Sequence, residues 1–119
     1  MISSWNAAEV AANAGGRVVK GNPSARGPIA VTIDSRVVEA GALFIGLSGS
    51  AQDGGEFAGA ALAAGAWGVI VSEQRAALLD CDEEQVVIAV SEPLKALADL
   101  AQAWRRELGC AVIAVTGST

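Results

Sequence analysis

The chain has 119 residues, 52% of them hydrophobic and 18% charged, so it can bury the core of one ordinary domain and is not a disordered tail. Eight basic and thirteen acidic residues give a net charge of −5, which argues against binding a nucleic-acid backbone by bulk charge. The sequence contains no histidine, which excludes Ser-His-Asp and Cys-His catalysis, histidine metal ligands and an imidazole pH switch within the chain.

The sequence shows no targeting or membrane segment. Its first residues, Met1 to Trp5, lack the basic stretch and following apolar stretch of a signal peptide. The uncharged stretch from Phe57 to Ser72 is shorter than the ~20 residues that span a bilayer, and glycines interrupt it. Cys81 and Cys110 form no CxxC pair, so we expect two buried, reduced thiols. These features predict a cytoplasmic protein that does not insert into membranes.

In the first half of the chain, one helix is followed by strands and loops. Asn6 and Glu9 have the spacing of a capping box, which predicts a helix that ends at Gly15-Gly16. A short strand over 17–19 and a Gly/Pro loop over 21–28 follow. Apolar runs then predict strands over 29–33 and 42–47, a glycine-rich loop over 48–55 and a helix over 56–64.

The second half alternates strands and helices more regularly. Near-continuous apolar runs predict buried strands over 67–71 and 86–90, with a short helix over 73–79 between them and a solvated acidic loop over 80–84. Ser91 has the character of an N-cap, and a helix follows whose apolar residues recur at helical spacing: Leu94, Leu97, Leu100, Ala101, Trp104 and Leu108. A last strand is expected over 111–115.

This alternation predicts an α/β fold, a small three-layer sandwich with a mostly parallel or mixed sheet. We expect Trp5, Trp67 and Trp104 to be core or interface anchors.

The end of the chain carries the first pattern that points to chemistry. The last strand runs directly into Thr116, Gly117, Ser118 and Thr119, which is how a phosphate-binding P-loop begins. The Gly-Lys-Thr half of that motif is missing, so a strand that simply ends in small residues is the alternative. Without the lysine, these four residues do not form a competent ATP site.

A second candidate site follows the strand over 29–33. Asp34, Ser35 and Arg36 place an acceptor, a hydroxyl and a forked cation at the carboxyl end of a strand, where ligands bind in α/β sheets. Ser35 could donate to a base carbonyl or a ribose oxygen, and Arg36 could bind a diphosphate bidentately. For Asp34 and Arg36 we favour the structural alternative, in which Asp34 caps a turn and Arg36 pairs with a carboxylate.

The glycine-rich loop is the third candidate site. Its glycines would let a planar ligand lie close to the backbone, and Phe57 could pack beneath it. An ordinary surface loop with an Asp-Gly turn explains the same residues equally well. The candidate ligand-binding residues of this loop are Ser48, Gly49, Ser50, Gln52, Asp53 and Gly54.

Taken in order, these features resemble the N-terminal domain of the Mur ligases, the ATP-dependent amide ligases that build the peptidoglycan stem peptide. The order is Asp-Ser-Arg, Gly41 to Leu47, the loop with Asp53-Gly54, Phe57 with Ala60-Ala61, Gly65 to Val71, and a strand into Thr-Gly-Ser. The opening segment, the helix over 97–106 and the Thr-Gly-Ser start are most similar to the ligase that adds D-alanyl-D-alanine. The ligase that adds the third residue of the stem peptide is the alternative.

The resemblance implies that residues 1–115 form a substrate-binding domain and that residues 116–119 begin the P-loop of a central ATP-binding domain. The first domain would hold the UDP end of UDP-N-acetylmuramoyl-tripeptide, with Ser35 on the uridine and the loop from Gly49 to Gly54 beside the uracil and ribose. In the full-length ligase, ATP and Mg²⁺ are bound in the central domain, where the tripeptide carboxylate is phosphorylated. The amine of D-alanyl-D-alanine then attacks the acyl phosphate.

One position departs from the family pattern. Gly55 stands where the family usually has the histidine of Asp-Gly-His, so the imidazole contact that the resemblance implies is absent at this position. Because the catalytic groups are expected outside residues 1–119, we expect this polypeptide alone to bind neither ATP nor Mg²⁺ and to have no ligase activity. The alternatives from other classes are an α/β module that docks on a partner without a ligand and a P-loop enzyme unrelated to the cell wall.

Overall fold

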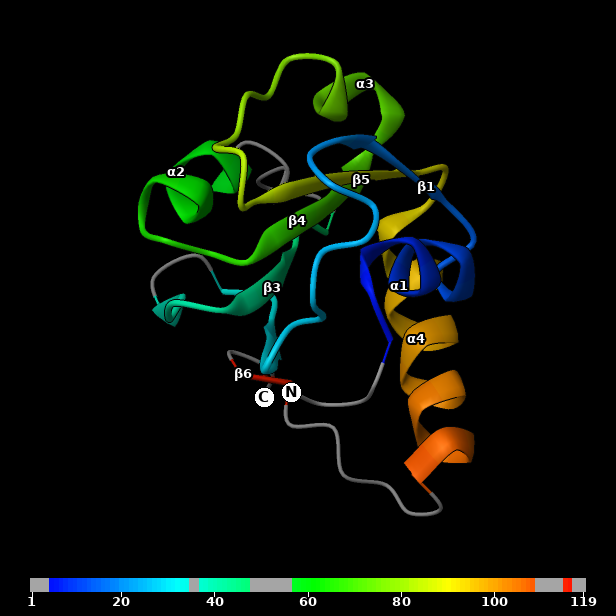
Figure 1. Cartoon of the computed structure of the whole chain (residues 1–119). Helices are drawn as coiled ribbons and strands as arrows, with labels where there is room; N and C mark the ends of the chain where they lie inside the picture. Colours follow the sequence, from blue (N-terminus) through cyan, green and yellow to red (C-terminus); the bar gives the residue numbers. More distant parts are fainter. Residues whose placement is uncertain (1–4, 35–36, 48–56, 109–114, 117–119) are drawn as a thin grey trace.

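Figure 1 shows the computed structural model of the chain, in which helices cover a mixed β-sheet. The structure describes residues 5–34, 37–47, 57–108 and 115–116. The helices are α1 (Ala7–Asn13), α2 (Ala58–Ala63), α3 (Glu73–Ala76) and α4 (Pro93–Leu108). The strands are β1 (Arg17–Lys20), β2 (Ala30–Thr32), β3 (Ala42–Ile45), β4 (Gly68–Ser72), β5 (Val86–Val90) and β6 (Val115–Thr116).

The strands lie in the order β1-β5-β4-β3-β2-β6. β2, β3, β4 and β5 are parallel neighbours in chain order, and β6 pairs parallel with β2. β1 pairs antiparallel with β5 and makes the sheet mixed. The predicted α/β fold with a mostly parallel or mixed sheet is therefore confirmed.

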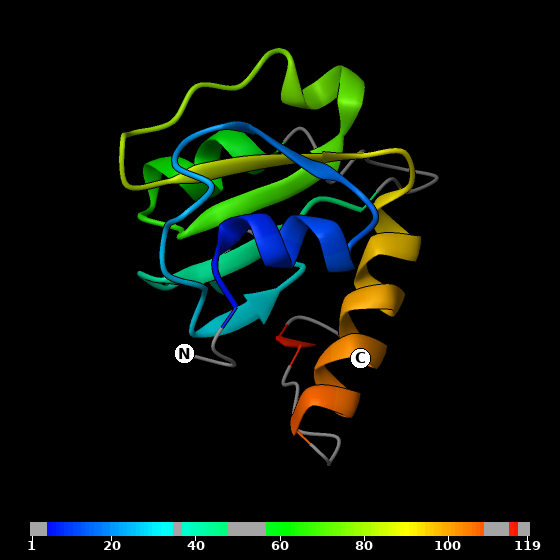
Figure 2. The same ribbon diagram turned by 45° about the vertical axis from the view of Figure 1, so that its right-hand side comes forward.

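Two hydrophobic cores, one on each face of the sheet, confirm the predicted three layers. One core lies under α1 and α4, and the other lies under α2 and α3 (Figures 1 and 2). Successive residues of β3 alternate between them, because Leu43 and Ile45 pack under α1 and α4 while Phe44 packs on the opposite face. This burial on both faces explains why the central strands are near-continuous apolar runs. No helix in the described part of the chain is long and apolar enough to cross a membrane.

The first helix forms as its sequence predicts. The Asn6 side chain accepts a hydrogen bond from the Glu9 backbone N–H at 2.9 Å, and the Glu9 carboxylate accepts one from the Asn6 N–H at 3.1 Å. This capping box satisfies two donors that the first turn of a helix leaves unpaired. Gly15, with φ of +77°, then takes the left-handed conformation that ends the helix.

The tryptophans are core anchors, as predicted. Trp5 stacks on Trp104 with ring centroids 5.4 Å apart and an interplanar angle of 19°, which ties the segment before α1 to α4. Trp67 is buried at the start of β4, and its indole N–H donates to the Arg26 carbonyl.

Several elements are shorter than predicted. The strand expected over 29–33 comprises only β2, and Ile29 is 54% exposed. The strand expected over 42–47 ends at Ile45, while the one expected over 67–71 is displaced by one residue. Apolar residues continue past the last paired residue of a ladder, so an apolar run does not mark where the pairing ends.

The predicted helices over 56–64 and 73–79 are also shortened, to α2 and to the four residues of α3. After α3 the chain continues with two hydrogen bonds between residues three apart, from Leu78 N–H to Arg75 at 3.0 Å and from Leu79 N–H to Ala76 at 3.3 Å. Such bonds tighten the chain into a turn rather than extending the α-helix.

The start of α4 corrects two predictions. Its first residue is Pro93, so Glu92 and not Ser91 precedes the helix, and the Glu92 carbonyl accepts from the Ala96 N–H at 3.0 Å. Leu94 is 66% exposed, whereas Leu100 is fully buried. Six residues at about 100° each leave Leu94 about 120° away from Leu100 around the helix. The buried stripe passes through Ala96, Leu97, Leu100, Ala103 and Trp104 instead.

Candidate functional site

The carboxyl ends of β2, β3, β4 and β5 lie side by side at one edge of the sheet, because these strands are parallel. In open α/β sheets, this is the edge at which ligands bind. The segments 34–36 and 48–54 leave from β2 and β3, which are neighbours paired with Thr32 opposite Phe44. Adjacent strands lie ~4.8 Å apart, so the chain leaves β2 and β3 from neighbouring strand ends.

Asp34 is the only one of the predicted UDP-binding residues that the structure describes. Ser35, Arg36, Ser48, Gly49, Ser50, Gln52, Asp53 and Gly54 all lie outside the described residues, as does Gly55. Their predicted roles therefore stay predictions, and what the structure contributes is the position of the strand ends from which they leave.

Thr32 holds the backbone of Asp34 in a turn directly after β2. The Thr32 side chain is buried, and its hydroxyl accepts from the Asp34 N–H at 3.1 Å and donates to the Asp34 carbonyl at 3.3 Å. That carbonyl also accepts from the Val37 N–H at 3.2 Å. Thr32 thus fixes the backbone of this turn, and the predicted capping by the Asp34 side chain stays a prediction. Thr32 is not among the predicted site residues, although a threonine at the end of an apolar strand is typical of a turn.

Hydrogen bonding and packing fix the chain directly before the predicted glycine-rich loop over 48–55. The Gly46 N–H donates to the Ile70 carbonyl at 2.9 Å, which extends the pairing of β3 with β4, and Leu47 packs against the core under α1 and α4. After the loop, Phe57 is 36% exposed at the start of α2. Its predicted packing beneath the loop involves residues outside the described ranges.

A hollow of about 650 Å³ lies at the same edge, over the ends of β4 and β5. Ser72 and Ser91 line it from the ends of these strands, and Pro93, Leu94 and Ala98 line it from α4. The Ser72 hydroxyl accepts from the Arg75 N–H at 3.4 Å and so caps α3. The residue pattern alone does not predict this hollow, because its lining residues come together only when β5 lies beside β4.

Two basic side chains near this hollow are paired with carboxylates. The Lys95 amine, on its rim, lies 2.7 Å from an Asp99 carboxylate oxygen, and this hydrogen bond raises the pKa of Lys95 above its ordinary value. In a smaller adjoining hollow, Arg17 lies 2.8 Å from the Glu73 carboxylate, and both side chains are exposed. Each of these two cations therefore already has a carboxylate partner.

The start of the predicted P-loop is described only in part. The strand expected over 111–115 appears as β6, which extends to Thr116 and pairs parallel with β2. Residues 109–114 and Gly117 to Thr119 lie outside the described residues. The interpretation of Thr116 to Thr119 as the start of a P-loop stays a prediction.

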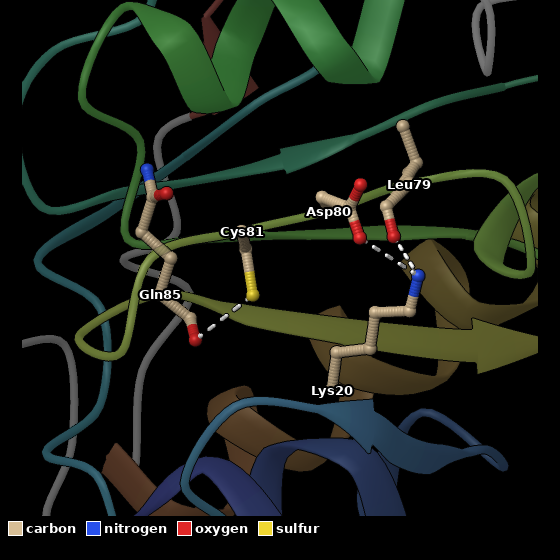
Figure 3. A network of polar contacts seen from close by, with 5 residues as sticks. All are labelled: Lys20, Leu79, Asp80, Cys81 and Gln85. Atoms are coloured by element: carbon tan, nitrogen blue, oxygen red, sulfur yellow. Dashed lines mark hydrogen bonds and ion pairs between the residues drawn. The ribbon is translucent and has the colours of Figure 1, made fainter.

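At the opposite end of the sheet, a polar network holds the loop between α3 and β5 (Figure 3). The Lys20 amine donates to the Leu79 carbonyl and lies 3.6 Å from an Asp80 carboxylate oxygen. The Cys81 thiol donates to the Gln85 carbonyl at 3.4 Å. The Gln85 side chain, which is buried, donates to the carbonyls of Leu62 and Ala66 at 2.8 Å each. The two hydrogen bonds of the Gln85 side chain join the end of α2 to the start of β5.

Cys81 is a free, half-buried thiol, so the predicted full burial is wrong for this residue. Burial raises the pKa of this thiol above its ordinary value of 9.0, although the Lys20 charge opposes the shift. The raised pKa keeps the thiol protonated and unreactive near neutral pH. Cys110 lies outside the described residues. Within the described ranges, no group of three or more acidic or cysteine side chains could hold a metal ion.

Comparison with known proteins shows to which protein family the chain belongs. Residues 30–105 match the family described as "Mur ligase family, catalytic domain", which covers well over half of the chain. The chain therefore belongs to the Mur ligase family, and the resemblance in its motifs is confirmed.

The similar proteins include two kinds of Mur ligase. The chain is 45% identical over 92 residues, or 75% of its length and 18% of the relative, to a UDP-N-acetylmuramoyl-L-alanyl-D-glutamate–2,6-diaminopimelate ligase of Synechococcus sp. (strain WH7803). It is 40% identical over 88 residues, 74% of its length and 19% of the relative, to a UDP-N-acetylmuramoyl-tripeptide–D-alanyl-D-alanine ligase of Bacillus subtilis. A crystal structure of MurF from Acinetobacter baumannii matches 87% of this chain and 21% of that protein, with a TM-score of 0.67 and 26% identity.

The chain spans about a fifth of the length of these relatives. Ligases with both kinds of name match it at similar identity, so the comparisons define the family and leave its particular reaction to be proposed.

Proposed function

We propose that residues 1–115 are the N-terminal domain of a Mur ligase and bind the UDP end of a UDP-N-acetylmuramoyl-peptide. The observation that carries this proposal is topological. The Asp-Ser-Arg segment and the glycine-rich loop, which carry the family resemblance, follow adjacent parallel strands and begin at the same edge. Because open α/β sheets bind ligands at this edge, two polar segments rooted there are suited to the two sides of a nucleotide.

The structure of the strand ends supports this role for the two segments. On the β2 side, the buried Thr32 hydroxyl holds the turn at Asp34. On the β3 side, the hydrogen bond from Gly46 to Ile70 fixes the point from which the loop leaves. Both segments therefore start from rigid elements, which is what a binding site needs in order to present side chains in a fixed geometry.

Titration of the ¹⁵N-labelled chain with UDP tests the proposal. We expect chemical-shift changes confined to residues 34–36 and 46–57, and their loss in the variants Ser35→Ala and Arg36→Ala. The matched controls Ser24→Ala and Arg105→Ala replace exposed residues of the same types away from this edge and should leave the titration unchanged. If millimolar UDP moves no resonance, in the chain or in the full-length parent, the domain is instead a module that docks on a partner without a nucleotide ligand.

Within the family, we propose that the parent protein adds D-alanyl-D-alanine to UDP-N-acetylmuramoyl-tripeptide. The match to MurF structures over 87% of the chain favours this substrate. The alternative is the ligase that adds the third residue of the stem peptide, and the 45% identity to a diaminopimelate ligase favours it. Assay of the parent with tripeptide substrate and D-alanyl-D-alanine, against dipeptide substrate and diaminopimelate, distinguishes the two by the mass of the product.

We propose that residues 116–119 begin the ATP loop of a second domain, which would bind ATP and Mg²⁺. Thr116 to Thr119 offer hydroxyls and backbone N–H groups but no cation, so they do not complete a site for a triphosphate by themselves. The isolated chain should therefore release no phosphate from ATP in the presence of both substrates, and measurable turnover would contradict this. A ligase acting on nucleotide-activated precursors with ATP is expected in the cytoplasm.

A further inference from the structure

We draw no further inference here: the strongest candidate, the hollow of about 650 Å³ over the carboxyl ends of β4 and β5 beside the first turn of α4, rests on a helix N-terminus whose neighbouring lysine is already paired with Asp99, and nothing in the described part of the chain shows what would occupy it.

Discussion

Replacing Thr32 by valine tests whether its hydroxyl organises the turn at the candidate site. Valine keeps the shape and the β-branched side chain that suit a strand, and it removes the oxygen that makes two hydrogen bonds with Asp34, of 3.1 Å and 3.3 Å. Each such bond contributes about 0.5–1.5 kcal/mol net, so the variant should lose about 1–3 kcal/mol of unfolding free energy. With a urea dependence of about 1.5 kcal/mol per molar, the unfolding midpoint should fall by roughly 0.7–2 M.

The same variant should weaken UDP binding if the proposed function holds. A loosened turn no longer presents residues 34–36 in one geometry, and we expect about tenfold weaker binding, equivalent to about 1.4 kcal/mol. Urea unfolding followed by tryptophan fluorescence measures the stability, and the ¹⁵N titration measures the affinity. Thr32→Ser is the control, since it restores the hydroxyl and should recover most of both losses. A valine variant that unfolds at the wild-type urea concentration would refute the role of the hydroxyl.

Further predictions concern the sheet, α4 and the thiol. Gly68→Ala places a methyl group 2.6 Å from the Val86 carbonyl oxygen of β5 and should lower the free energy of unfolding by about 1–3 kcal/mol or more. Gly59→Ala in α2, where the nearest contact of the new methyl group would be 3.8 Å, should raise it by about 1 kcal/mol. Urea unfolding of both variants measures these changes. Leu100→Ala should cost about 2–5 kcal/mol, and Leu94→Ala on the same helix less than about 0.5 kcal/mol; equal losses would contradict the burial of α4. Cys81 should react with iodoacetamide more slowly in the folded than in the urea-unfolded chain at pH 8, because burial raises its pKa; mass spectrometry of its peptide measures both rates. The same shift predicts that stability falls as the pH rises above 9.0, where the unfolded chain loses this proton first, and Cys81→Ser should reduce that fall.

Predictions succeeded where neighbouring residues decide the structure. The capping box of Asn6 and Glu9 joins residues three apart, so it forms as soon as α1 forms. The run from Val86 to Val90 is apolar throughout and became β5 with the predicted bounds. A residue pattern is sufficient in both cases, because the stabilising contacts are local or are the same on both faces of the element.

Predictions failed where neighbouring elements decide which residues are buried and where a strand ends. Leu94 belongs to the apolar repeat of α4 by its spacing, yet the sheet covers a stripe centred on Leu100 and leaves Leu94 in solvent. The expected strands over 29–33 and 42–47 are apolar beyond β2 and β3, and their ladders end earlier. Partner strands and covering helices set these limits, and a pattern within one segment carries no information about them.

For the candidate site, the sequence by itself determined the kinds of side chain available: a hydroxyl, a carboxylate and a guanidinium after one strand, and a glycine-rich polar loop after the next. It also determined that these strands are apolar enough to be buried and that helices separate the later ones. Only the tertiary structure decided that β2 and β3 are parallel neighbours and that β1 closes the far edge in the opposite direction. Strand order and direction depend on contacts between residues far apart in the chain, and these form only when the whole sheet packs between its two layers of helices.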